Sequence, residues 1–202
     1  EADAATVVAG QNTYLGAFAG RFLDDGSDNV AIGYDAMASN SDGAANAVNS
    51  AIAIGRNAMA GSVSNQGTIS IGYYAGDHAS ADVDNAVIIG REAGRGAMTS
   101  AADGTIAIGY TAGGSITSAQ QNTLVGYEAG KSITTGGYNA IFGYQAGDAL
   151  TIGDWNVAIG RNALTAEDVG RATVAIGMNS LLQQNSDSDN EITNNVAVGL
   201  NT

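Results

Sequence analysis

The stretch Asn156-Val-Ala-Ile-Gly-Arg-Asn-Ala163 is the clearest copy of a unit that recurs along the chain. A short apolar run ending in glycine returns eleven times, and six of the ten intervals between these repeat glycines are 17 residues, the others being 18, 19 and 22. Self-similarity at a fixed period predicts an array of stacked units. The repeat glycines are Gly16, Gly33, Gly55, Gly72, Gly90, Gly109, Gly126, Gly143, Gly160, Gly177 and Gly199.

Each unit contains an alternating run that is typical of a short β-strand with one buried face. The residue just before the glycine is always large and apolar, as in Ile32 and Ile108, and we expect it to point inward. The residue two places earlier is usually Val or Ile, and the one between is often Ala or Ser. Three residues after the glycine stands Ala in the first nine copies and Ser180 in the tenth, which predicts close approach of the next coil or of a neighbouring chain.

The second half of each unit is less regular. Ile116, Ile133 and Leu150 fall seven residues after their glycines, and we expect them to face the same core from a second, weaker strand. Asn, Gly and Asp between the apolar positions predict turns. Longer insertions at 40–49 and 183–191 are expected to bulge from a corner of the coil.

These features predict an all-β fold, a parallel β-solenoid of about eleven units of about 17 residues. Residues 1–10 form a lead-in, and residues 11–202 form a single repeat array. The apolar content is rich in Ala and poor in aromatics, so one coil has a thin core. Association of several coils would supply the missing core.

Charge and hydropathy argue against two classes of partner. The formal net charge is −13, and no basic stripe is present, so binding to a nucleic-acid backbone is not expected. No apolar run approaches the roughly 18 residues that span a bilayer, so membrane insertion is not expected either.

The unit Asn156-Val-Ala-Ile-Gly-Arg-Asn-Ala163 resembles the head repeat of trimeric autotransporter adhesins of the YadA type. The longer form Asn122-Thr-Leu-Val-Gly-Tyr-Glu-Ala-Gly130 is similar to repeats in bacteriophage tail fibres. The resemblance implies a left-handed β-roll, a homotrimer, an extracellular location and adhesion to a host surface. The usual head repeat is nearer 14 residues, and no coiled-coil stalk or anchor is visible, which favours a virion fibre over a bacterial surface adhesin.

Tyrosines follow five of the repeat glycines, and arginines follow three others (Arg56, Arg91 and Arg161). In a parallel stack these side chains lie one above another, so the column is either a structural ladder or an exposed face that binds sugars or proteins. The candidate binding residues are Tyr34, Tyr73, Tyr110, Tyr127 and Tyr144.

Two acidic clusters carry enough oxygen ligands to be candidate Ca²⁺ sites, although neither matches a known calcium loop and solvated turns are the alternative. Their residues are Asp24, Asp25, Asp28, Asp187, Asp189 and Glu191. No other cofactor is predicted. The single histidine, His78, lies in a turn without a nucleophile motif around it, so catalysis is not expected.

Asparagines four residues before several glycines, such as Asn139, are expected to form a hydrogen-bonded ladder.

The sequence therefore predicts a structural or adhesive fibre segment, either of a trimeric phage tail fibre or of a cell-surface adhesin. Its expected partners are two further copies of itself and a glycan or protein on the host surface. The alternative is a passive spacer, or a filament component of a virion or surface layer, that binds no receptor. A flat ice-binding face is disfavoured because the strands carry Val, Ala and Ile instead of Thr arrays.

Overall fold

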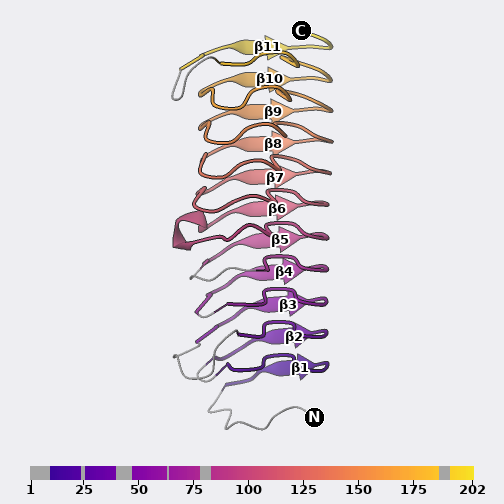
Figure 1. Cartoon of the computed structure of the whole chain (residues 1–202), viewed down its shortest axis with the longest axis vertical. Coiled ribbons are helices and arrows are strands. Elements are labelled where there is room, and N and C mark those ends of the chain that lie inside the picture. The colour runs from indigo at the N-terminus through magenta and orange to yellow at the C-terminus, as the bar shows by residue number, and fades with distance from the viewer. Residues whose placement is uncertain (1–9, 24–25, 40–46, 63, 78–82, 187–191) are drawn as a thin grey trace.

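The computed structural model describes residues 10–23, 26–39, 47–62, 64–77, 83–186 and 192–202. These residues form eleven three-residue strands, which pair in chain order in one parallel sheet (Figure 1). The strands are β1 (Thr13–Leu15), β2 (Val30–Ile32), β3 (Ile52–Ile54), β4 (Ile69–Ile71), β5 (Val87–Ile89), β6 (Ile106–Ile108), β7 (Thr123–Val125), β8 (Ala140–Phe142), β9 (Val157–Ile159), β10 (Val174–Ile176) and β11 (Val196–Val198). The predicted parallel β-solenoid is confirmed.

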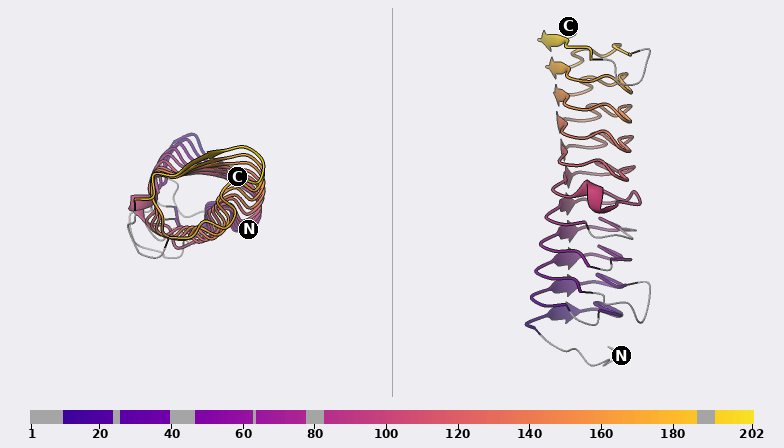
Figure 2. Two further views of the ribbon diagram at one scale, coloured as in Figure 1. Left: turned by 90° about the horizontal axis from the view of Figure 1, so that it is seen from above. Right: turned by 90° about the vertical axis from the view of Figure 1, so that its left-hand side faces the viewer.

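Equivalent positions of successive units lie one above another. Val30 pairs with Ile52, and Ile32 pairs with Ile54, so the register of the sheet is the register of the repeat. Seen from above, the turns superpose as a closed loop, and the strands form one wall of it (Figure 2). We call the unit that contains strand βn rung n. Among the described residues the only helix is the 3₁₀ turn η1 (Ser100–Ala102), between β5 and β6.

The repeat glycine ends each strand with a backbone conformation that other residues do not adopt. Its φ lies between 127° at Gly177 and 142° at Gly126. A Cβ built on Gly33 would lie 2.6 Å from the carbonyl oxygen of Gly55 in the next rung. Both reasons for glycine, positive φ and close approach of a neighbouring backbone, therefore hold at this position.

The alanine three residues after the glycine packs against the next coil. Ala36 and its equivalents up to Ala163 are completely buried. The Ala36 N–H donates to the Gly33 carbonyl at 3.4 Å, and the Ala58 carbonyl of the next rung accepts from the Met37 N–H at 2.8 Å. A larger side chain would separate the rungs, so the small residue preserves the stacking of the coil.

Pairs of complementary size fill the core inside the coil. The central residue of each strand points inward, and the residue four places after the repeat glycine faces it. Where the strand residue is large, as at Ile141, the facing residue is Gly147, whose Cβ would lie 2.9 Å from Ile141 Cδ1. Where the strand residue is Ala158, the facing residue is Leu164, and both are fully buried.

Ile116, Ile133 and Leu150 are fully buried and complete this core, as predicted. The second strand expected around them is not formed, because within the described ranges each rung contains one strand and the rest is turns. Backbone hydrogen bonds between rungs still stabilise this wall, for example from Thr134 N–H to the Thr151 carbonyl at 2.9 Å.

Asparagine side chains form hydrogen bonds between successive rungs at the corner that precedes the sheet. The Asn139 side-chain oxygen accepts from the Asn156 N–H at 2.8 Å, and its amide donates to the Gly153 carbonyl at 2.9 Å. Asn122 makes the equivalent bonds one rung earlier. The ladder predicted from the sequence is present, but its bonds run chiefly from side chain to backbone, with one amide pair between Asn139 and Asn122 at 3.0 Å.

Candidate functional site

The outer side of the sheet is a continuous apolar surface. The central strand residues, such as Ala107 and Ala158, are fully buried inside the coil, whereas their flanking neighbours are half-buried or exposed. Of the two flanking residues in each strand, all of which the structure describes, none is charged and only Thr13 and Thr123 are polar. We call these two columns the apolar sheet face.

The prediction that the residue before the repeat glycine points inward is wrong. Ile159 and Phe142 are 39% and 38% exposed, although strands above and below cover their sides. At the ends of the sheet, where one neighbouring strand is missing, Leu15 and Val198 reach 65% and 66%. The two flanking residues of each strand therefore face out, and the central residue faces into the narrow coil.

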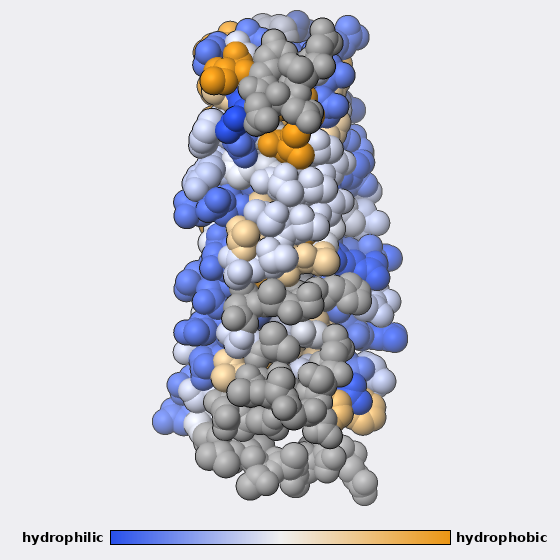
Figure 3. Space-filling model, turned by 60° about the vertical axis from the view of Figure 1, so that its left-hand side comes forward, coloured by the Kyte–Doolittle hydropathy of each residue, from blue (hydrophilic) through white to orange (hydrophobic). Residues whose placement is uncertain are grey.

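The opposite side of the molecule differs in character. Figure 3 shows the side that faces away from the strands, and its coloured surface is mostly pale or blue, with orange near the C-terminal end. The Val and Ile residues at the flanking positions of the strands lie on the sheet side of the rod, which this view does not show.

The five predicted tyrosines form one ladder with three arginines, along the corner that follows the sheet. Tyr110, Tyr127 and Tyr144 stack with centroids 5.0 and 5.1 Å apart. Arg56 lies 5.5 Å from the Tyr34 ring and 6.0 Å from the Tyr73 ring. Equivalent contacts place Arg91 between Tyr73 and Tyr110, and Arg161 beyond Tyr144.

The ladder presents ring edges and hydroxyl groups to the outside. Tyr34, Tyr127 and Tyr144 are 44 to 46% exposed, yet the faces of the central rings are turned toward one another. Burial by its neighbours raises the pKa of the Tyr127 hydroxyl, and the nearby Glu128 carboxylate raises it further. A sugar ring that stacks on an aromatic face would have to displace a ladder neighbour, so binding here would use the hydroxyl groups.

Charged residues border the ladder at rung 7. A hydrogen bond from Gln145 at 2.7 Å holds the pKa of the Glu128 carboxyl below its usual value, and Lys131 at 3.2 Å acts in the same direction. For Lys131, burial lowers the pKa, but hydrogen bonds to Glu128 and Asp148 outweigh it and raise the value overall. Glu128 and Lys131 line a shallow hollow of about 340 Å³ together with Tyr110.

A second aromatic pair lies at the corner that precedes the sheet, and sequence reasoning missed it. Tyr138 and Trp155 stack at 6.4 Å and are 44% and 51% exposed. Arg171 lies 4.5 Å from the Trp155 ring and pairs with Asp154 at 2.8 Å. The available signal was that the same repeat position holds Ser50, Gly67 or another small or polar residue in most rungs.

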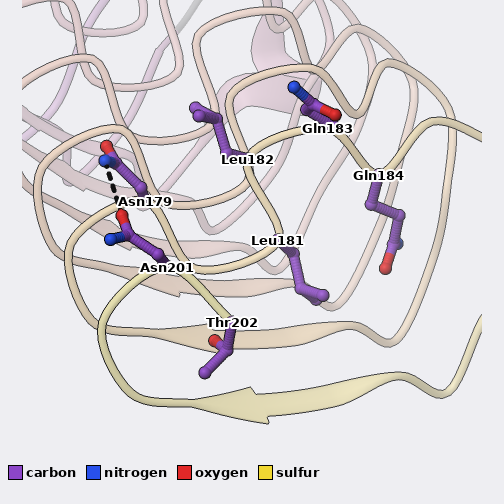
Figure 4. A pocket seen from close by; sticks show the side chains of 7 residues that line it. All are labelled: Asn179, Leu181, Leu182, Gln183, Gln184, Asn201 and Thr202. Atoms are coloured by element: carbon purple, nitrogen blue, oxygen red, sulfur yellow. Dashed lines mark hydrogen bonds between the residues drawn. The ribbon is translucent and has the colours of Figure 1, made fainter.

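A hollow of about 450 Å³ lies at the last two rungs. Figure 4 shows the side chains that line it, at the end of the coil where the stack stops. Asn179 donates to Asn201 at 2.9 Å across it. Leu181 and Leu182 provide its apolar wall. Its position at the uncovered end of the stack explains the hollow without a ligand.

Glu167 is a buried carboxylate that the sequence did not reveal. It occupies the core position that Ile133 and Leu150 hold in earlier rungs and has no exposed surface. Its oxygens accept from Gly170 N–H at 2.7 Å, from the Gln184 amide at 2.9 Å and from the Ser186 hydroxyl at 3.1 Å. These bonds attach residues 184–186 to the rung below, which is a structural role.

The candidate Ca²⁺ ligands are largely untestable in this structure, because Asp24, Asp25, Asp187, Asp189 and Glu191 lie outside the described residues, as does His78. Asp28 is exposed and accepts from the Ser27 hydroxyl at 3.2 Å. Over the described ranges there is no group of three or more acidic, His or Cys residues that could hold a metal ion.

Comparisons with family models, with curated proteins and with solved structures give no match to this chain. In the part of the chain that the structure describes, no helix is both long and apolar enough to cross a bilayer.

Proposed function

We propose that this chain is a shaft segment of a homotrimeric attachment fibre, in which three solenoids associate through their apolar sheet faces. The observation that carries the proposal is the outward orientation of the two flanking columns along all eleven rungs, in which Val and Ile predominate. Strands favour β-branched residues, and threonine is β-branched but would expose less apolar surface than Val or Ile at these outward positions. Only two flanking positions, Thr13 and Thr123, use it.

The size of the face supports association. Ten rung steps of about 4.8 Å make it about 50 Å long, and a three-residue strand makes it about 10 Å wide. Soluble monomers rarely expose contiguous apolar patches above a few hundred Å², so a strip of roughly 500 Å² is at the upper limit. A ring of three copies would turn every strip toward a common axis and close the assembly.

We further propose that the fibre is extracellular, on a virion or a bacterial surface, and that it contacts a glycan or protein of the host. The resemblance of the repeat to adhesin heads and phage tail fibres supports this assignment. With the sheet faces turned inward, the regular row of hydroxyl groups on the tyrosine ladder would border the outer surface. The proposal assigns the chain no catalytic step and no cofactor.

The second candidate is a passive spacer, and the ladder geometry favours it. The rings of Tyr110, Tyr127 and Tyr144 cover one another, so the surface that usually binds sugars is already occupied. A spacer would need the stiffness of the ladder but no ligand.

Binding of the trimer to host cells and to an array of surface glycans separates the two candidates. The variant Tyr127→Arg keeps the ladder, because Arg91 occupies the same position between two tyrosines, but it removes the central hydroxyl. Adhesion predicts that binding by the wild type falls at least about tenfold in this variant while the unfolding midpoint changes little. Absence of binding by the wild type, or equal binding by both proteins, would favour the spacer.

A further inference from the structure

Lateral association of a regular solenoid has a problem of register. A shift of one rung, about 4.8 Å, would again place Val and Ile against Val and Ile, so most of the apolar sheet face cannot distinguish one alignment from the next. A rung that differs from the others would give the aligned assembly a fit that a slipped copy loses. The inference that follows rests on the proposed association of identical chains.

Strand β8 is that rung. It carries Ala140 where other strands carry Val, Ile or Thr, and Phe142 where they carry Leu, Ile or Val. Phe142 is the only aromatic residue among the outward strand positions, all of which the structure describes, and it is 38% exposed. The neighbours of Phe142 in its own column are ordinary, with Val125 below it and Ile159 above it. The face thus has one projection and, beside it on the same strand, one depression.

In a ring of parallel copies about an axis along the rod, each sheet meets the next edge to edge at the same height. The column before the glycine in one copy then faces the column two places earlier in the next. We infer that β8 is the register key of the assembly: Phe142 of one copy fills the space left by Ala140 of the adjacent copy. The partner is a second copy of this chain, parallel and in register.

Other alignments would lose this fit. A copy shifted by one rung would press Phe142 against Thr123 or Val157 of its neighbour, with no room for the ring. An antiparallel copy with full overlap would place rung 8 opposite rung 4, which carries Ile69 and Ile71. Overfilling a packed interface is unfavourable, so the off-centre position of the key selects both direction and height.

Three variants test the key. Ala140→Val closes the depression and is expected to raise the concentration at which the assembly dissociates at least about tenfold, as seen by sedimentation equilibrium. The double variant A140V/F142I restores an ordinary Val-x-Ile rung and is expected to associate about as tightly as the wild type. Phe142→Ile alone leaves the depression unfilled and should fall between them. Position 140 faces outward, so circular dichroism should show the same fold in all four proteins.

A spin label reports the register directly. The chain has no cysteine, so Ser115→Cys on the exposed corner of rung 6 accepts one label. The wild-type background should give one narrow distance between copies, and A140V/F142I should give a broad or multiple distribution because slipped alignments become accessible. A wild-type protein with the mass of one chain would refute the proposed association itself. A wild-type trimer that is unaffected by Ala140→Val, or a double variant with one narrow distance, would overturn only the register key.

Discussion

At the scale of single residues, the coil depends on positive φ angles at residues other than glycine, which the sequence does not indicate. The residue two places after the repeat glycine is never glycine, yet its φ is positive in every rung, from 47° at Thr111 to 61° at Phe18. Its N–H donates to the rung below, as Glu92 does to the Tyr73 carbonyl at 2.8 Å. Stacking therefore supplies the bonds that hold an otherwise unfavourable conformation.

Substitution of a repeat glycine should be costly. Gly33→Ala would place a Cβ against the Gly55 carbonyl at a φ of 133°, and we expect a loss of at least about 2 kcal/mol in the free energy of unfolding. Gly104→Ala is the matched control, because its φ is 70° and the nearest atom to a Cβ is 3.7 Å away. It should cost about 1 kcal/mol. Urea unfolding measures both, and equal losses would contradict the role given to backbone contact.

The individual residues show what a repeat pattern can and cannot predict. The tyrosine ladder followed from the period, because residues one period apart must stack in a parallel coil. The environments of Trp155 and Glu167 did not follow from it, since each residue departs from the usual type at its repeat position and its neighbours are known only from the structure. Exposure of the ladder was left open by the sequence, and coverage of its ring faces depends on side-chain rotamers that only the structure shows.

At the scale of one rung, the sizes of the central strand residue and of the turn residue that faces it are complementary in most rungs; rungs 4 and 6, with Ser70 and Gly76 and with Ala107 and Gly113, are the exceptions. Ile141 with Gly147 and Ala158 with Leu164 are two solutions of the same packing problem in adjacent rungs. Leu164 has φ 55° and Gly147 has φ 54°, so the backbone is the same in both. In one rung the large residue is on the strand, and in the next it is on the turn. Neither the central strand position nor the position four after the repeat glycine therefore shows a strict preference for one residue size.

This pairing predicts strong coupling. Ile141→Ala should cost about 2–5 kcal/mol through the cavity it leaves, and Gly147→Leu should be destabilising because Ile141 occupies the space. The double variant I141A/G147L recreates the arrangement of the next rung and should recover at least about 2 kcal/mol of the summed losses. Chemical unfolding of the four proteins gives the coupling energy. Simple additivity would show that the two residues do not share one space.

The rung is also where sequence reasoning failed. Alternation established that the two faces of the strand differ, but not which face points inward. Bulky apolar residues were assigned to the inside on the usual expectation of burial. The inside of a 17-residue coil is too narrow for Ile on the strand and Met or Leu on the turn together, as Ala53 opposite Met59 shows. Size complementarity between those two positions is visible in the sequence of most rungs, and it favours the correct orientation.

At the scale of the molecule, the solenoid separates two surfaces. The net charge is −13, and the eleven strands contribute none of the charged residues; those in the described part of the chain lie between the strands. One long apolar face bordered by polar corners is the arrangement expected of a subunit whose flat side meets its own copies. Length, period and strand order were predictable from the repeat, whereas the presence of this face became clear only with the orientation of the side chains.

The solution mass of the wild type and of Ile108→Lys, measured by light scattering with circular dichroism, tests the orientation and role of the apolar sheet face most directly. The wild type should have three times the chain mass of 20.1 kDa. Ile108→Lys should be a folded single chain, because an outward lysine can extend into water but cannot be buried between copies. A wild type with the mass of one chain would contradict the account, and so would an Ile108→Lys variant that unfolds because its side chain belongs to the interior of the coil.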